Sequence, residues 1–444
     1  MTRAWLCDGF AAVSEILEEP ASPESFARVT TPGERRRAFT ILFFSLMCLG
    51  AGQSVMFVVL PSLVRKMGLS ELQGALPFVS SATIWVFSSG FWGVRSDRWG
   101  RKPIMLLGLV AFGISFASFA MVTSAGVNKF LPLTAAWILM IATRSLYGIF
   151  GSGAAPAAQA YVADRTTRAE RTRGVATIGA AFGLGTAIGP AIGSALVVFG
   201  LFAPFYFTAL AAFASAAAIW YFLPERTMPR HHQPVKRTLQ WYDRRVLPFI
   251  IYGLGLSTAG AIPIQTVGYL FMDVLHLTPD ETPQYSGIGF MVFAGASLFA
   301  QLVIVQRFNL SARALIQWGG VIALASNVLF AIGHQFGPLV FALVISGLGF
   351  GMARPGYSAA ASLSVSPEEQ GAIAGLTSAM AGAGFIFGPL IGNALYEMNP
   401  AAPYIFGAAL MAALIIYAHF SQHLKNAGSA PDGEETADTQ VPNA

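Results

Sequence analysis

This chain contains twelve long apolar runs. Each is about 20 residues long or longer, the length that a helix needs to cross a bilayer core. Only 11% of the 444 residues are charged, whereas a soluble protein carries about a quarter. The runs therefore predict an all-α integral membrane protein with twelve transmembrane helices. The expected spans are residues 39–64, 73–94, 104–124, 131–162, 172–199, 201–223, 246–273, 284–306, 314–333, 337–364, 370–397 and 402–422.

The positions of the cations predict how these spans are oriented. Of the 27 Lys and Arg, 22 fall on one side of the predicted spans, three on the other (Arg65, Lys66 and Lys129), and two within spans (Arg144 and Arg354). Membrane proteins concentrate Lys and Arg in their cytoplasmic connections. We therefore expect both termini in the cytoplasm, in a multi-pass protein of the inner membrane of a cell.

Polar segments divide the chain into two sets of six spans. Residues 224–245, with six Lys or Arg and two acids, form the expected linker between halves at 38–223 and 246–422. Residues 1–37 and 423–444 are expected to be cytoplasmic tails. No uninterrupted apolar run follows a basic start in the first tail, so a cleaved signal peptide is not expected.

The two halves repeat each other in sequence. A shift of 199 residues places Gly183–Leu196 on Gly382–Leu395 with eight of fourteen positions identical, and it also carries Pro156 onto Pro355. Parallel repeats in transporters place the substrate between the halves, near the middle of the membrane. The repeat therefore predicts two pseudo-symmetric six-helix halves around a central site.

The stretch Gly93–Pro103 reads Gly-Val-Arg-Ser-Asp-Arg-Trp-Gly-Arg-Lys-Pro and is predicted to be a charged cytoplasmic turn between two spans. It resembles the signature loop between helices two and three of the major facilitator superfamily, which has Leu and Ala at the positions of Arg95 and Ser96. The resemblance implies the major facilitator fold. The gating residues that it indicates are Gly93, Asp97, Arg98, Gly100, Arg101 and Lys102.

A second group of charges follows span four and begins at Asp164. Asp97 and Asp164 are the acids best placed to pair with cations across the bundle at its inner side. We expect such pairs to close that side in the outward-open form and to break on inward opening. The same connection in the second half keeps Arg307 and Arg313 but has no Gly or Asp, so the gating charge is expected in the first half.

Span five carries glycines at every fourth position followed by a proline. Such spacing lets a neighbouring backbone approach one face closely, and the proline bends the helix. The pattern resembles the span-five motif of antiporters in the superfamily, although Ser194 replaces its usual last Gly. Ordinary small-residue packing remains the alternative. The residues concerned are Gly185, Gly189, Pro190 and Gly193.

Span four contains Arg144-Ser-Leu-Tyr147-Gly148, which resembles the Arg-x-x-Gln-Gly stretch of the family with Tyr147 in place of Gln. A charge at this depth is costly to insert, so Arg144 is not expected to face lipid. In relatives this Arg is associated with proton coupling and the central cavity. The alternative is that Arg144 clamps backbone carbonyls of neighbouring helices.

Arg354, near the middle of span ten, is the second cation within a span. Its partner in the repeat is Ala155, so it is a feature of one half only. The transported molecule could supply the negative charge for these cations, or helix carbonyls and water could satisfy them. The expected lining of the substrate and proton cavity is Gln53, Arg144, Tyr147, Gln265, Tyr269, Arg354 and Tyr357.

Motifs and charges that are absent from the sequence exclude some classes of function. It contains no nucleotide-binding loop and no Asp or Glu in the middle of any span. We therefore expect a gradient-driven transporter rather than an enzyme, with no metal, no cofactor and no nucleic-acid partner. Its partners would be a small-molecule substrate, protons and the lipid bilayer, and a monomer is expected.

Taken together, the motifs are most similar to bacterial drug–proton antiporters such as the tetracycline exporters. The resemblance implies proton-coupled efflux of a small amphiphilic or anionic compound by alternating access. An importer or facilitator of a small organic solute, such as a siderophore, sugar or organic acid, is the alternative within transporters. A scaffold on this fold is the alternative outside them, but it would not need the charges within spans four and ten.

Overall fold

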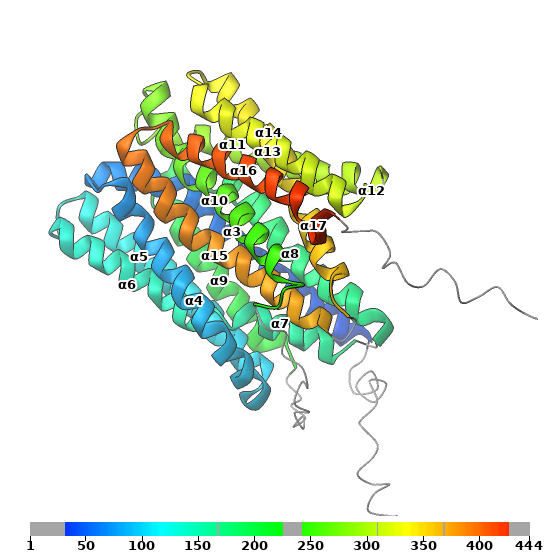
Figure 1. The fold of residues 1–444 in the computed structure, drawn as a ribbon. Coiled ribbons are helices and arrows are strands. Elements are labelled where there is room, and N and C mark those ends of the chain that lie inside the picture. Colours follow the sequence, from blue (N-terminus) through cyan, green and yellow to red (C-terminus); the bar gives the residue numbers. More distant parts are fainter. Residues whose placement is uncertain (1–31, 167, 225–241, 309, 367–368, 426–444) are drawn as a thin grey trace, which may run out of the picture.

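A computed structural model describes residues 32–166, 168–224, 242–308, 310–366 and 369–425, and these residues form helices and short connections only. The long helices lie side by side, with the light-blue and cyan helices toward one side of the bundle and the yellow helices toward the other (Figure 1). The first half of the chain forms α3 (Pro32–Met67), α4 (Glu71–Trp99), α5 (Arg101–Val127), α6 (Leu133–Gly151), α7 (Ala154–Asp164), α8 (Arg168–Leu196), the short η1 (Val197–Phe199) and α9 (Ala203–Phe222).

The second half repeats this order of helices. It forms α10 (Leu247–Leu275), α11 (Thr282–Phe299), a π-helical turn η2 (Ala300–Ile304), α12 (Val305–Arg307), α13 (Ala312–Ile332), α14 (Phe336–Leu363), α15 (Gln370–Met398), α16 (Ala402–Phe420) and the short α17 (Gln422–Lys425). Because α6 with α7, and α11 with η2 and α12, each make one span, the described chain has twelve spans. Eleven are apolar enough to cross a membrane by length and composition. The twelfth is α4, whose last turns carry charges.

The charged stretch between α4 and α5 is not the turn that the sequence predicted. The helix α4 continues through Trp99, and α5 begins at Arg101, so Gly100 alone connects them. Gly100 has φ 97°, which favours glycine because a side chain is strained there. We call the end of the bundle at Gly100 the basic end, and the end at the α3–α4 connection, residues 68–70, the far end.

The repeated glycines bring two pairs of helices into close contact. A Cβ added to Gly185 of α8 would collide with the carbonyl oxygen of Met47 in α3. In the second half, a Cβ on Gly388 of α15 would lie 2.6 Å from the Cβ of Ala261 in α10. The first and fifth spans of each half therefore pack in the same way, as expected for two pseudo-symmetric halves.

Replacing Gly189 with alanine should destabilise the protein by about 1–3 kcal/mol, because overpacking forces backbones apart. A Cβ at Gly189 would collide with the Ser54 hydroxyl and the Ala51 carbonyl oxygen of α3. Gly183, two turns earlier in α8, has no atom within 4 Å of such a Cβ, so Gly183→Ala is the matched control. Melting temperatures in detergent would compare them, and equal loss in both variants would contradict this packing.

The buried apolar residues show where the two halves are joined. One core cluster runs through the first half and includes second-half residues near the far end, among them Phe271 and Tyr396. A separate cluster, with Tyr252 and Met411, belongs to the second half alone. In the described residues the halves therefore share a core toward the far end.

Candidate functional site

Arg101 is the centre of an ion-pair cluster at the basic end. As the first residue of α5, it contacts Asp97 of α4 (NH2 to Oδ1, 2.5 Å) and Asp164 of α7 (Nε to Oδ2, 3.3 Å). Its NH1 also donates to the Ser96 hydroxyl over 2.6 Å. Both acids thus share a partner inside the first half. The pairs across the bundle that the sequence suggested for the outward-open form stay a prediction. The cluster holds the basic ends of α4, α5 and α7 together.

The other predicted gating residues lie around this cluster. Lys102 donates from Nζ to the carbonyl oxygens of Trp220 and Leu223, each over 2.8 Å. These carbonyls end α9, where the last turn of a helix lacks internal partners. Arg98 is exposed, and a Cβ on Gly93 would meet no atom within 4 Å. Gly93 and Arg98 are therefore not enclosed in this conformation, whereas Lys102 joins α5 to α9.

Arg144 lies in the interior of the first half, 0% exposed. Its NH2 donates to Oε1 of Gln53 in α3 over 3.0 Å, and its guanidinium carbon lies 5.0 Å from the centre of the Phe116 ring and 5.4 Å from that of Tyr147. Its Nε and NH1 have no hydrogen-bond partner in the described part of the chain. The structure thus brings together three predicted cavity residues, Gln53, Arg144 and Tyr147, around a cation that lacks full hydrogen bonding.

The four predicted cavity residues of the second half do not form one cluster. Arg354 is exposed, and its NH2 lies 3.2 Å from where a Cβ on Gly260 would stand. Tyr357 is instead packed in the second half, with its hydroxyl against Gly253 of α10. Gln265 is buried, and its Nε2 has no partner among the described residues.

Tyr269 lies at the far end rather than with the other predicted cavity residues. Its ring centre is 5.7 Å from the guanidinium carbon of Arg65 and 5.8 Å from the ring centre of Tyr396. Its hydroxyl faces Gly74 of α4. Tyr269 therefore belongs to the contact between the halves at that end.

A cluster that the sequence reasoning missed joins the two halves at the far end. Arg65 of α3 contacts Glu71 of α4 over 2.6 Å and Asp273 of α10 over 2.9 Å, both from NH2. Tyr396 of α15 donates its hydroxyl to Oδ2 of Asp273 over 2.7 Å. We call Arg65, Glu71, Asp273 and Tyr396 the far-end latch. In the sequence, Arg65 follows the first span and Asp273 ends the seventh. Because 208 residues separate them, the sequence does not show that they meet.

Two further contacts cross between the halves beside the far-end latch. Lys66 contacts Asp280 over 2.6 Å, and the backbone N–H of Leu72 donates to Oε1 of Glu397 over 2.9 Å. Both ion pairs that the structure describes between the first and second halves are therefore at the far end. The ion pairs described at the basic end lie within one half.

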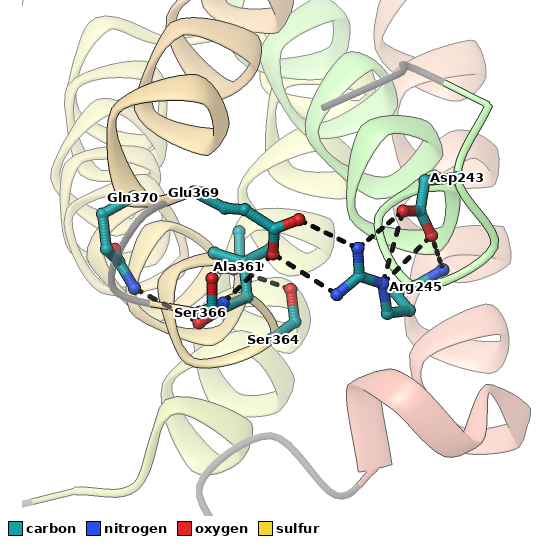
Figure 2. Close-up of polar contacts among 8 residues, drawn as sticks. Asp243, Arg245, Ala361, Ser364, Ser366, Glu369 and Gln370 are labelled. Carbon is teal, nitrogen blue, oxygen red and sulfur yellow. Dashed lines mark hydrogen bonds and ion pairs between the residues drawn. The ribbon is translucent and has the colours of Figure 1, made fainter. Parts of the chain in front are cut away.

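Figure 2 shows a second cluster that sequence reasoning missed, at the basic end of the second half. Arg245, just before α10, contacts Asp243 over 2.8 Å and Glu369, just before α15, over 3.1 Å. Arg245 holds the pKa of both carboxyls below their ordinary values by hydrogen bonding and charge, and the carboxylates raise the pKa of Arg245.

The first half contains a counterpart of this cluster. The 199-residue shift carries Glu170 onto Glu369, and Glu170 of α8 lies 3.6 Å from Arg35 of α3. In each half, a glutamate at the start of the fifth span thus pairs with an arginine at the start of the first. The repeat extends from the glycine packing to these charges.

A groove of about 820 Å³ lies on the first half between α5 and α9, lined mainly by apolar side chains such as Leu107 and Phe213. The described residues contain no group of three or more His, Cys, Asp and Glu side chains placed to hold a metal ion. The candidate site therefore rests on Arg144 and on the charged clusters at the two ends.

The sequence of this chain matches a known protein family. The sequence profile of the Major Facilitator Superfamily matches residues 42–325 and 282–440. The chain belongs to the Major Facilitator Superfamily. It is therefore a multi-pass membrane transporter and not an enzyme, which confirms the fold and the class of function that the charged stretch and the repeat implied.

Relatives of known name extend over most of the chain. Multidrug resistance protein 2 of Bacillus subtilis (strain 168) is 28% identical over 394 residues, which cover 85% of this chain and 93% of the relative. The class B tetracycline resistance protein of Escherichia coli is 26% identical over 358 residues, 78% of this chain and 85% of that protein. These relatives confirm the similarity to drug and tetracycline exporters predicted from the motifs.

Solved structures agree with the fold. The nucleoside transporter NupG matches with a TM-score of 0.68 at 15% identity, covering 86% of this chain and 98% of that chain. The human organic anion transporter MFSD10 (TETRAN) matches with a TM-score of 0.59 at 20% identity, covering 87% and 100%. At these identities the likeness shows the fold alone.

Proposed function

We propose that this major facilitator exports a small amphiphilic or anionic compound in exchange for protons, by alternating access. The observation that carries the proposal is the uneven placement of the contacts between the halves. The described ion pairs between them, Arg65–Asp273 and Lys66–Asp280, lie at the far end. At the basic end, Cβ atoms on Gly90 and Gly93 of α4, or on Gly371 and Gly375 of α15, would meet nothing within 4 Å.

This asymmetry supports a bundle that is closed at one end and open at the other. The cation bias favours the basic end as the cytoplasmic one, so the conformation would be inward-open, with both termini in the cytoplasm. The proposed units are residues 38–223 and 246–422, joined by the linker 224–245 and flanked by the tails 1–37 and 423–444. We further propose that the protein works as a monomer in a cell inner membrane.

The direction of transport rests on the relatives. They are named for resistance to several drugs, to tetracycline and to quinolones, and export is the simplest way for a transporter to confer resistance. The resemblance of the α8 glycines to the antiporter motif adds support, and these glycines pack closely against α3.

Inverted membrane vesicles test this proposal directly. When the interior is made acidic, the vesicles should accumulate at least one compound from a panel of fluorescent drugs, and a protonophore should abolish the accumulation. Vesicles from cells that lack the protein would be the control for leakage. Accumulation that is the same with and without the pH gradient would contradict proton-coupled export. So would a nutrient whose uptake by intact cells requires this protein.

The same vesicles test whether the substrate is an anion. Arg354 is exposed within α14, where a charged group is costly unless it is hydrated or paired. Arg354→Gln should raise the apparent KM for anionic compounds more than for neutral ones, and Arg354→Lys should retain part of the transport. An equal loss of transport for anionic and neutral compounds would indicate a folding defect, and the anionic substrate would be removed from the proposal.

A further inference from the structure

We propose that the transported compound is an aromatic acid, whose ring stacks on Phe385 of α15 and whose anionic group binds Arg144 of α6. The inference rests on the proposed export and deepens it, because it names the class of substrate and the two sides of its site. Two observations carry it: a cluster of phenylalanine rings between the halves, and a buried guanidinium close to that cluster which lacks hydrogen-bond partners.

Three phenylalanines from both halves form a cluster that we call the aromatic wall. The ring of Phe385 lies nearly parallel to that of Phe57 in α3, with 3° between the planes and 6.2 Å between the centres. Its centre is also 6.0 Å from that of Phe78 in α4. Such separations are typical of attractive aromatic pairs. Phe57 and Phe385 are both partly exposed, so a further ring can reach them.

The aromatic wall lies where the two halves begin to part. On its basic-end side, a Cβ on Gly382 of α15 would still lie 3.6 Å from Val86 of α4. Closer to the basic end, Cβ atoms on Gly90 of α4 and Gly371 of α15 would meet nothing within 4 Å. A compound that enters between α4 and α15 from the basic end therefore reaches the aromatic wall before the far-end latch.

The anion-binding side of the site lies one helical turn from the aromatic wall. Phe57 follows Gln53 by four residues in α3, which places the two side chains on one face with about 5–6 Å between their Cβ atoms. Gln53 is partly exposed, and its Oε1 accepts a hydrogen bond from Arg144 over 3.0 Å. Arg144 itself is fully buried, so an anion reaches it when the Gln53 side chain turns aside.

A carboxylate would bind Arg144 better than the amide of Gln53 does. A hydrogen bond between two charged groups is roughly twice as strong as a neutral one. The Nε and NH1 of Arg144 have no partner in the described part of the chain, and a carboxylate has two oxygens with which to accept from them. The substrate anion therefore takes the place of the Gln53 oxygen and completes the hydrogen bonding of the guanidinium.

The short distance between the two sides defines the class of compound. A ring on the aromatic wall and an anion at Arg144 are about one turn apart, so the charge must be attached directly to the ring or through a short chain. An aromatic cation without an acidic group fits poorly, because Arg144 would repel it. Aryl carboxylates and phenolates fit both sides.

Isothermal titration calorimetry on the purified protein in detergent tests the class directly. The probes are naphthoate, its saturated analogue decalin carboxylate, and the neutral naphthamide. Naphthoate should bind about two- to tenfold more tightly than the saturated acid, as expected for one stacked aromatic pair. It should bind about tenfold or more tightly than the amide, since a hydrogen bond to a charged group is lost.

Two variants assign these preferences to the residues. Phe385→Leu keeps an apolar side chain but no ring, so it should weaken the binding of naphthoate to that of the saturated acid. Phe387→Leu is the matched control, because Phe387 of α15 is exposed, and it should leave the binding unchanged. Gln53→Glu supplies a carboxylate beside Arg144, so it should remove the preference for naphthoate over naphthamide.

The outcomes that overturn this site differ from those that overturn export. If naphthoate binds to the wild-type protein no better than either analogue, the aromatic acid is excluded, and this comparison needs no variant to fold. Unchanged naphthoate binding in Phe385→Leu would exclude the aromatic wall. If the binding preferences hold but vesicles export no compound, the export function fails and the site stands. If vesicles export only compounds without a ring or an acid, export stands and this site fails.

Discussion

Replacing Arg144 with methionine should abolish transport and leave the protein at least as stable as the wild type. The guanidinium is fully buried and has one described hydrogen bond, to Gln53, while its Nε and NH1 have none in the described chain. Exchanging buried charged groups for apolar side chains of similar volume is often neutral or stabilising, by about 1–4 kcal/mol. A charge kept at such a cost indicates a role in transport, where it can meet a substrate or proton in another conformation.

Melting temperatures in detergent and proton-driven uptake in inverted vesicles would measure the two effects together. Arg307→Met is the control, because Arg307 of α12 is exposed, and surface substitutions usually change stability by about 0.5 kcal/mol or less. If Arg144→Met instead lost several kcal/mol of stability, Arg144 would be the structural clamp that the sequence also allowed. Retained transport would remove Arg144 from the mechanism.

Replacing Asp97 with asparagine should leave insertion and stability nearly unchanged but remove most transport. Asp97 and Asp164 share Arg101 at the basic end, and all three side chains are partly exposed. Exposed ion pairs contribute about 0–1 kcal/mol to stability, so their loss should not unfold the protein. The charge matters if Arg101 and the two acids change partners when the basic end closes, a step that Asn cannot perform.

The second half provides a matched control for Asp97. Asp243 also shares an arginine, Arg245, with a second acid, Glu369, at the same end of the bundle (Figure 2). Asp243→Asn should therefore keep its transport if gating charge lies in the first half, as the sequence predicts. An equal loss of transport in both variants would show that gating charges lie in both halves. Full transport by Asp97→Asn would exclude the Arg101 cluster from the transport mechanism.

Much of this protein follows from local sequence patterns. The length of the apolar runs predicts the spans, because a helix in lipid must satisfy its own backbone and be long enough to cross. The 199-residue repeat predicts the halves, and the glycines at Gly185 and Gly189 predict the packing of α8 on α3, because only small residues allow such an approach. The apolar runs and the glycine spacing can be recognised within a few turns of one helix, and the repeat is found by comparing two such segments.

The partners of the charged side chains were decided only by the tertiary structure. Arg65 meets Asp273 across 208 residues of chain, and Arg101 of α5 brings together Asp97 of α4 and Asp164 of α7. Tyr269 and Tyr357, both predicted to line the cavity, lie in different places: Tyr269 at the far end, and Tyr357 inside the second half. The sequence predicts how deep a residue lies in its own span. The rotation of that helix about its axis, and the helices beside it, are determined by packing between helices. Charge pairing depends on those neighbours.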